Sequence, residues 1–164
     1  MIPDFGMVEL VVVDIDGTLT DAKIGWGGVD IGWTQTFSVR DGEAIRRLVS
    51  RGIGVVPLSR NQTECARVRM EGLGLPTTWV GVGDKTSAFD ELRAHYGVPI
   101  ESIAYVGDGA EDAPLIRAVG LGCSVADGHP AARAAAKYVT QARGGQHALE
   151  EVVERIFEAR GWQP

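Results

Sequence analysis

The stretch from Val8 to Val13 restricts the possible folds most, because it is almost wholly apolar and rich in valine. Such a run is typical of a strand buried on both faces of a parallel sheet. Two carboxylates, Asp14 and Asp16, follow it directly. Residues two apart in an extended chain share a face, so these groups would repel unless a cation or a proton lay between them. Gly17 then permits a sharp turn, and the pattern indicates a site that binds a metal and handles an anion.

The composition is that of an ordinary globular protein. The 164 residues are 45% hydrophobic and 23% charged, which favours one domain over residues 1–164. A net charge of −6 argues against a nucleic-acid partner. No apolar stretch approaches the roughly 20 residues of a membrane span, and the chain starts without a signal-like segment. We therefore expect a cytoplasmic protein with no membrane partner, in which Cys65 and Cys123 are reduced.

Strand-like runs alternate with helical patterns along the chain, which predicts an α/β fold with a doubly wound parallel sheet. If the strand order is 3-2-1-4-5, the first strand lies beside the fourth, and ligands bind at the carboxyl ends there. The fourth run is followed by Gly107-Asp108-Gly109-Ala110-Glu111-Asp112, so further carboxylates should converge on Asp14 and Asp16. The predicted strands are Val8–Val13, Ile53–Leu58, Thr78–Val82, Ile103–Val106 and Leu121–Val125.

One segment, at about residues 22–39, interrupts the alternation of strands and helices. It contains a Gly-Gly turn signal between aromatic residues, which predicts a projecting β-hairpin. Trp26, Trp33 and Phe37 carry too much apolar surface for an isolated ribbon in water. We expect them to pack on another subunit.

The acidic residues indicate a phosphoryl-transfer site. Asp14, Asp16 and Asp108 together suit Mg²⁺, a hard cation that prefers oxygen ligands. Asp14 would be the nucleophile that attacks phosphorus and forms an aspartyl phosphate. Asp16 would protonate the leaving oxygen and then activate the water that hydrolyses the intermediate.

The phosphate must be held without a Walker loop, because the sequence contains none. The candidates are the backbone N–H groups of the turn at Gly17, the hydroxyl of Ser59 after the second strand, and the ammonium group of Lys85. Asp112 either caps a helix or orients Lys85 or the waters of the metal. Ser59 and Lys85 could also be an ordinary strand end and a solvated helix start.

These residues resemble the four motifs of the haloacid dehalogenase superfamily of phosphohydrolases, and the resemblance covers nearly the whole chain. Within it the chain is most similar to the 3-deoxy-D-manno-octulosonate 8-phosphate (KDO 8-phosphate) phosphatases. The narrower likeness rests on DGTLTD at 16–21, FSVRDG at 37–42, GDK at 83–85, GDGAEDAP at 107–114, VADGHP at 125–130 and YVTQARGG at 138–145.

The resemblance implies roles for particular residues. It implies a Rossmann-like fold in which the hairpin replaces a cap domain and four subunits assemble through it. Asp14 becomes the nucleophile, Asp16 the acid/base and a metal ligand through its backbone carbonyl, and Asp108 a metal ligand. Ser59 and Lys85 become phosphate contacts. The Gly-Gly segment at 144–145 resembles a tail that closes over a neighbouring subunit's site.

Three arginines are candidates for binding the substrate. Arg69 stands at the spacing from Ser59 at which the family places a substrate-binding arginine, while Arg40 and Arg143 could equally be surface ion-pair residues. The chain also departs from the family's TGR pattern, because Arg60 and Asn61 follow Ser59. It has Gly107-Asp108-Gly109 instead of GDD, and its tail departs from GGxGA. These departures leave the chemistry in place but leave the substrate open.

The expected function is Mg²⁺-dependent hydrolysis of an acidic sugar phosphate, first of all KDO 8-phosphate. A nonulosonate 9-phosphate of the sialic acid or KDN type is an alternative substrate. A non-catalytic assembly domain, like that linked to cytidylyltransferases, is an alternative of another class, and the joint presence of the five site residues argues against it. A signalling receiver domain would leave the paired carboxylates unexplained.

Overall fold

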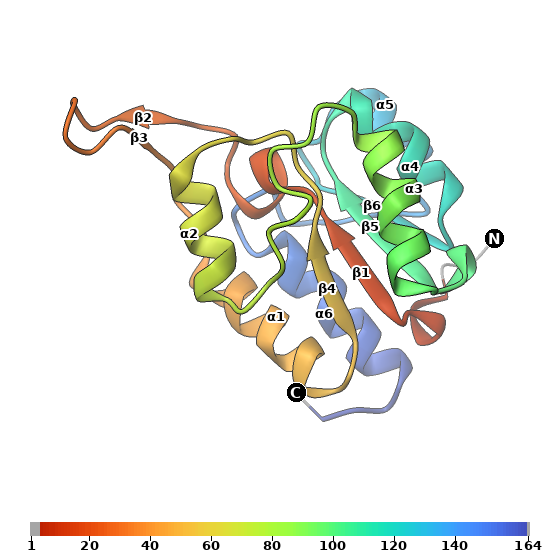
Figure 1. Cartoon of the computed structure of the whole chain (residues 1–164). Helices are drawn as coiled ribbons and strands as arrows, with labels where there is room; N and C mark the ends of the chain where they lie inside the picture. The colour runs from red at the N-terminus through yellow and green to blue at the C-terminus, as the bar shows by residue number, and fades with distance from the viewer. Residues whose placement is uncertain (1–3, 164) are drawn as a thin grey trace.

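The computed structural model describes residues 4–163, in which five parallel strands form the central sheet in the order β4-β1-β5-β6-β7 (Figure 1). This order confirms the predicted α/β fold and places the first strand beside the predicted fourth. The register pairs Val13 with Pro57 on one side and with Val106 on the other, so the three strands end at one edge. The strands are β1 (Leu10–Val13), β4 (Gly54–Pro57), β5 (Ile103–Gly107), β6 (Leu121–Ser124) and β7 (Tyr138–Val139).

The sheet differs from the predicted one at both ends. The expected strand at Thr78–Val82 is reduced to a single parallel bridge between Ser59 and Val80. It stays short because Val80 N–H donates to the carbonyl of Thr77 in a turn and Gly81 has a φ of 87°. The opposite edge carries β7, which the sequence did not suggest because only two residues pair.

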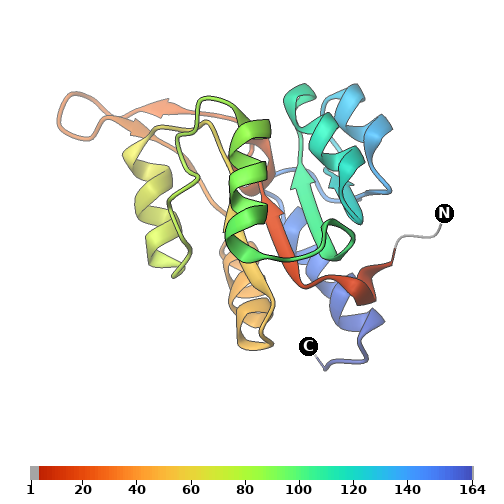
Figure 2. The same ribbon diagram turned by 45° about the vertical axis from the view of Figure 1, so that its right-hand side comes forward.

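Helices cover both faces of the sheet (Figure 2), and the side chains of β1 alternate between two apolar clusters. Val11 and Val13 pack in the cluster with α1, α2 and α6, whereas Leu10 and Val12 pack in the cluster with α3, α4 and α5. This two-sided burial explains why the strand is an almost continuous apolar run. The helices are α1 (Val39–Ser50), α2 (Glu64–Gly72), α3 (Lys85–Tyr96), α4 (Ala113–Ala118), α5 (Pro130–Ala135) and α6 (Ala148–Ala159), with single-turn helices at Phe5–Met7, Ile100–Ser102 and Ala110–Asp112.

The predicted hairpin is present and extends away from the body of the molecule (Figure 1). Its antiparallel strands are β2 (Gly25–Trp26) and β3 (Trp33–Thr34), and the rings of Trp26 and Trp33 meet edge to face at 5.1 Å. These side chains are 57% and 51% exposed. Phe37 differs from the expectation, because it is half-buried against the core of its own chain. Within the described residues, no helix has both the length and the apolar character needed to cross a membrane.

Candidate active site at the carboxyl edge of the sheet

A cavity of about 470 Å³ opens at the carboxyl ends of β1, β4 and β5. Four of the predicted residues line it: Asp14 after β1, Asp16 in the following turn, Ser59 after β4 and Asp108 after β5. They come together because parallel strands all end at the same edge of the sheet.

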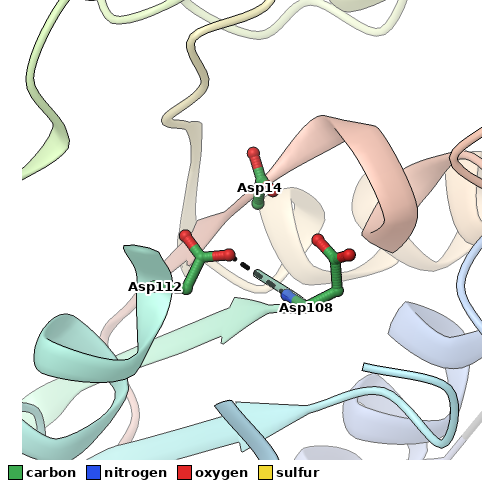
Figure 3. A group of neighbouring side chains, drawn as sticks. All are labelled: Asp14, Asp108 and Asp112. Atoms are coloured by element: carbon green, nitrogen blue, oxygen red, sulfur yellow. Dashed lines mark hydrogen bonds between the residues drawn. The ribbon is translucent and has the colours of Figure 1, made fainter. Parts of the chain in front are cut away.

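Three carboxylates gather beside this cavity. Asp14, Asp108 and Asp112 each offer one oxygen, and the three oxygens lie within 4.8 Å of one another (Figure 3). The predicted metal ligands were Asp14, Asp16 and Asp108, with Asp16 contributing its backbone carbonyl. The carboxylate of Asp16 lines the same cavity, where it accepts hydrogen bonds from the side-chain amides of Asn61 and Gln35.

Asp112 is fully buried, and its two oxygens are already occupied by hydrogen bonds. Oδ1 accepts from Lys85 Nζ at 2.8 Å and from the Tyr105 hydroxyl at 2.7 Å. Oδ2 accepts from the backbone N–H groups of Gly109 at 2.8 Å and Asp108 at 3.2 Å. Asp112 therefore holds Lys85 and the start of the Asp108 loop in place, and Asp14 and Asp108 remain as the carboxylates available to a cation.

Lys85 is the first residue of α3 and only 4% exposed. Its ammonium group lies 2.9 Å from Asp14 Oδ1 and 2.8 Å from Asp112 Oδ1. Burial alone would lower the pKa of Lys85, but the two carboxylates outweigh it and raise the pKa above its usual value. The site thus contains a permanent positive charge next to the proposed nucleophile.

The local charge balance favours a bound cation. Burial, reinforced by the neighbouring Asp112 and Asp108 and opposed by Lys85, raises the pKa of Asp14 to about 8. Burial and Asp112 likewise raise the pKa of Asp108 to about 6. Burial is the main cause of both raised pKa values, and a divalent ion bound between the two carboxylates would take the place of their protons.

Gly17 is required in the turn after Asp14 for two reasons. Its φ of 79° lies in the left-handed region, and a Cβ there would overlap the carboxylate of Asp108. The tail of the same chain presses on this turn from the other side. Gly145 N–H donates to the carbonyl of Thr18 at 2.9 Å, and a Cβ on Gly144 would overlap the carbonyl of Gly17. In this structure the Gly-Gly segment therefore lies on its own chain's turn.

The three predicted arginines lie elsewhere, and among the described residues none of them lines this cavity. Arg40 pairs with Glu150 at 2.7 Å, Arg143 pairs with Asp127 at 3.1 Å, and Arg69 lines an apolar groove beside the hairpin.

Other residues also contribute to the site. Arg60, already noted as a departure from the family pattern, lines the cavity and pairs with Glu111 at 2.9 Å. Gln35, Asn61 and Tyr105 hold the carboxylates of Asp16 and Asp112. Asn61 was noted in the sequence as a departure from the family pattern, without a role. Gln35 and Tyr105 carry no local signal, because their roles arise only from contacts over 19 and 7 residues of sequence.

Comparison with known proteins identifies the family of this chain. The sequence profile of the haloacid dehalogenase-like hydrolases matches residues 80–144. The KDO 8-phosphate phosphatase KdsC of Yersinia pestis is 35% identical over 155 residues, which cover 93% of this chain and 81% of that protein.

Solved structures extend the likeness to the fold. A putative KDO 8-phosphate phosphatase from Vibrio cholerae superposes with a TM-score of 0.92 at 31% identity, covering 98% of this chain and 89% of that one. The Moraxella catarrhalis KDO 8-phosphate phosphatase, solved with a magnesium ion, a phosphate ion and KDO, gives 0.89 at 29% identity, covering 96% and 90%. The chain belongs to the haloacid dehalogenase-like hydrolases and, within them, to the KDO 8-phosphate phosphatase family. It is accordingly a phosphatase.

Proposed function

We propose that this chain hydrolyses KDO 8-phosphate with the aid of Mg²⁺ through an aspartyl-phosphate intermediate. The observation that carries the proposal is the cavity in which Asp14, Asp16, Ser59 and Asp108 all meet. The named activity of the similar proteins supports the choice of sugar.

The residues present fit a divalent metal ion. Asp14, Asp108 and Asp112 cluster beside a single ammonium group, that of Lys85, which pairs with Asp14 and Asp112. Carboxylate oxygens are the ligands that Mg²⁺ prefers. Asp14 and Asp108 would hold the ion, joined by Asp16 as the resemblance implies. A bound Mg²⁺ would neutralise negative charge on the phosphoryl oxygens during the reaction.

The chain's own residues perform the covalent steps. A carboxylate oxygen of Asp14 attacks phosphorus, and the bond between phosphorus and the sugar oxygen breaks while Asp16 gives that oxygen a proton. Asp16 then takes a proton from a water molecule, which attacks the aspartyl phosphate. This second step releases inorganic phosphate and restores the carboxylate of Asp14.

Ser59 and Lys85 would bind the transferring phosphoryl group together with the turn at Gly17. The Ser59 hydroxyl accepts a hydrogen bond from Asn61 N–H at 3.2 Å, which leaves its own proton free to donate to a phosphate oxygen. Lys85 is held by Asp112 at the first turn of α3, where the helix dipole also favours an anion.

A substrate comparison tests the proposal directly. Phosphate release would be measured with KDO 8-phosphate, a nonulosonate 9-phosphate and glucose 6-phosphate, each with Mg²⁺ and after chelation. We expect the highest kcat/KM with KDO 8-phosphate, no turnover in the chelator, and recovery when Mg²⁺ is added back. A preference for the nonulosonate would transfer the proposal to that substrate class. Unchanged rates in the chelator would exclude the metal role of Asp108.

The exposed hairpin supports a second proposal, that the protein is a homotetramer assembled through this element. An apolar groove of about 1010 Å³ adjoins it, lined by residues that include Ile31, Trp33, Phe37 and Val68. Apolar surface of this extent in contact with water is characteristic of an interaction site.

Replacing Trp33 with Asp should therefore reduce the assembly, because a charge would be buried in the interface. Light scattering after size exclusion would measure the mass. Val49→Asp is the matched control, since Val49 is 50% exposed on α1 and Trp33 is 51% exposed. A Trp33→Asp protein with the mass of the unmodified assembly would refute the hairpin interface.

A further inference from the structure

The carboxylate of Asp16 accepts hydrogen bonds from two side-chain amides that come from different parts of the fold. Asn61 Nδ2 donates to both oxygens, at 2.8 Å and 3.0 Å, and Gln35 Nε2 donates to Oδ1. Asn61 follows β4, whereas Gln35 is the first residue after β3 of the hairpin. We propose that Gln35 and Asn61 are positioning residues that fix Asp16 for proton transfer. This inference rests on the acid/base role given to Asp16 in the proposed function.

Neighbouring hydrogen bonds show which end of each side-chain amide is the NH₂ group and which is the oxygen. The key donor is a backbone N–H, which can only donate. The backbone N–H of Thr63 donates to Asn61 Oδ1 at 2.7 Å, so the NH₂ group of Asn61 must be the end that faces Asp16. The same NH₂ group also donates to Gln35 Oε1 at 2.9 Å. The oxygen of Gln35 is thereby identified, and its NH₂ group in turn faces Asp16.

The network is anchored at the start of α2. Thr63 is the N-cap of that helix, and its Oγ1 accepts from Ala66 N–H at 3.3 Å. Its hydroxyl also lies 3.1 Å from Gln35 Oε1 and 2.7 Å from Asn61 Oδ1, and its single proton can serve one of them at a time. Asn61 Oδ1 accepts from Thr63 N–H, and Gln35 Oε1 accepts from Asn61 Nδ2. Both amides therefore make a hydrogen bond that does not involve Asp16.

These hydrogen bonds matter because the terminal torsion angle of an aspartate side chain otherwise takes a broad range of values. Asp16 is only half-buried and lies in a turn, so neighbouring side chains alone would not hold its plane. Three hydrogen-bond contacts from the NH₂ groups of two side-chain amides, which come from two different loops, fix that plane. General acid catalysis depends on this alignment, since small displacements of the acid slow proton transfer strongly.

Substrates with different leaving groups can distinguish a role in positioning Asp16 from a purely structural role of Gln35. A sugar hydroxyl must receive a proton from Asp16 as it leaves, whereas p-nitrophenolate leaves without one. Rapid-quench single turnovers would follow the first release step with an alkyl sugar phosphate and with p-nitrophenyl phosphate. The variants are Gln35→Met, which removes the donor, and Gln35→Glu, which places a carboxylate against Asp16.

For the sugar phosphate, we expect the first-turnover rate to fall at least tenfold in Gln35→Met and further in Gln35→Glu, with KM changed less than about threefold. The first turnover of p-nitrophenyl phosphate should change less than about threefold. Thr34→Val is the control. Among the described residues, the Thr34 hydroxyl donates only to the carbonyl of Gly25 across the hairpin, so the change should leave both rates unchanged.

Equal losses with both substrates, or no loss with either, would overturn the positioning role. The comparison remains informative if KDO 8-phosphate is not the substrate, because any sugar phosphate that the protein hydrolyses supplies the poor leaving group. A wrong substrate would therefore appear as a preference for another sugar phosphate, whereas a wrong positioning role would appear as equal losses with both leaving groups.

Discussion

Replacement of Asp14 by Asn is expected to lower kcat by about 10⁴-fold or more, because the amide cannot form the aspartyl phosphate. The fold should survive. Asn keeps the shape of the side chain, its carbonyl oxygen can still accept from Lys85, and one of three crowded carboxylates is neutralised. Steady-state phosphate release and urea unfolding without metal would measure the two effects.

The neutral variant should also bind Mg²⁺ more weakly, since it loses one charged oxygen ligand. Asp90→Asn is a matched control, because Asp90 is an exposed carboxylate on α3 with a side chain 70% exposed. The control should keep its activity. Turnover of Asp14→Asn at the unmodified rate would remove Asp14 from the role of nucleophile.

Replacement of Lys85 by Met should lower the free energy of unfolding by about 3–5 kcal/mol at about pH 9.5 without metal, and abolish turnover. The change leaves the buried carboxylates of Asp14 and Asp112 facing each other without their cation, and breaking a buried ion pair costs about this much. Met fills nearly the same volume, so the loss reports charge more than packing.

The loss should shrink as the pH falls. The pKa of Asp14 is already raised from 3.8 to about 8, so its folded form holds a proton more tightly than its unfolded form does. A raised carboxyl pKa costs stability as the pH rises from about 4 to the folded pKa. Removal of Lys85 raises that pKa further, so the additional cost develops mainly above about pH 8. Urea unfolding at about pH 6 and about pH 9.5 would show the difference. Lys23→Met is the control, because the Lys23 side chain is 84% exposed, and it should show no pH-dependent loss of stability. Equal losses of stability in Lys85→Met at both pH values would contradict the charge argument.

Much of the fold could be read from periodicity alone. The valine run of β1 signalled burial on both faces, and Leu149, Val152, Val153, Ile156 and Phe157 of α6 are all buried as their spacing suggested. The short elements were the failures. The third predicted strand became a bridge at Val80, and β7 went unnoticed, because two or three residues carry too little pattern to reveal pairing.

The sequence by itself determined the reaction class and which residues meet in one cavity, because Asp14, Asp16, Ser59 and Asp108 follow predicted strands that must end at one edge of a parallel sheet. Only the tertiary structure decided how these groups are held. Asp112 turned out to clamp Lys85, and Gln35 reaches Asp16 from a hairpin whose position no periodicity specifies. The succession of strands and helices follows from local patterns, whereas contacts between distant side chains depend on where loops bring them in space.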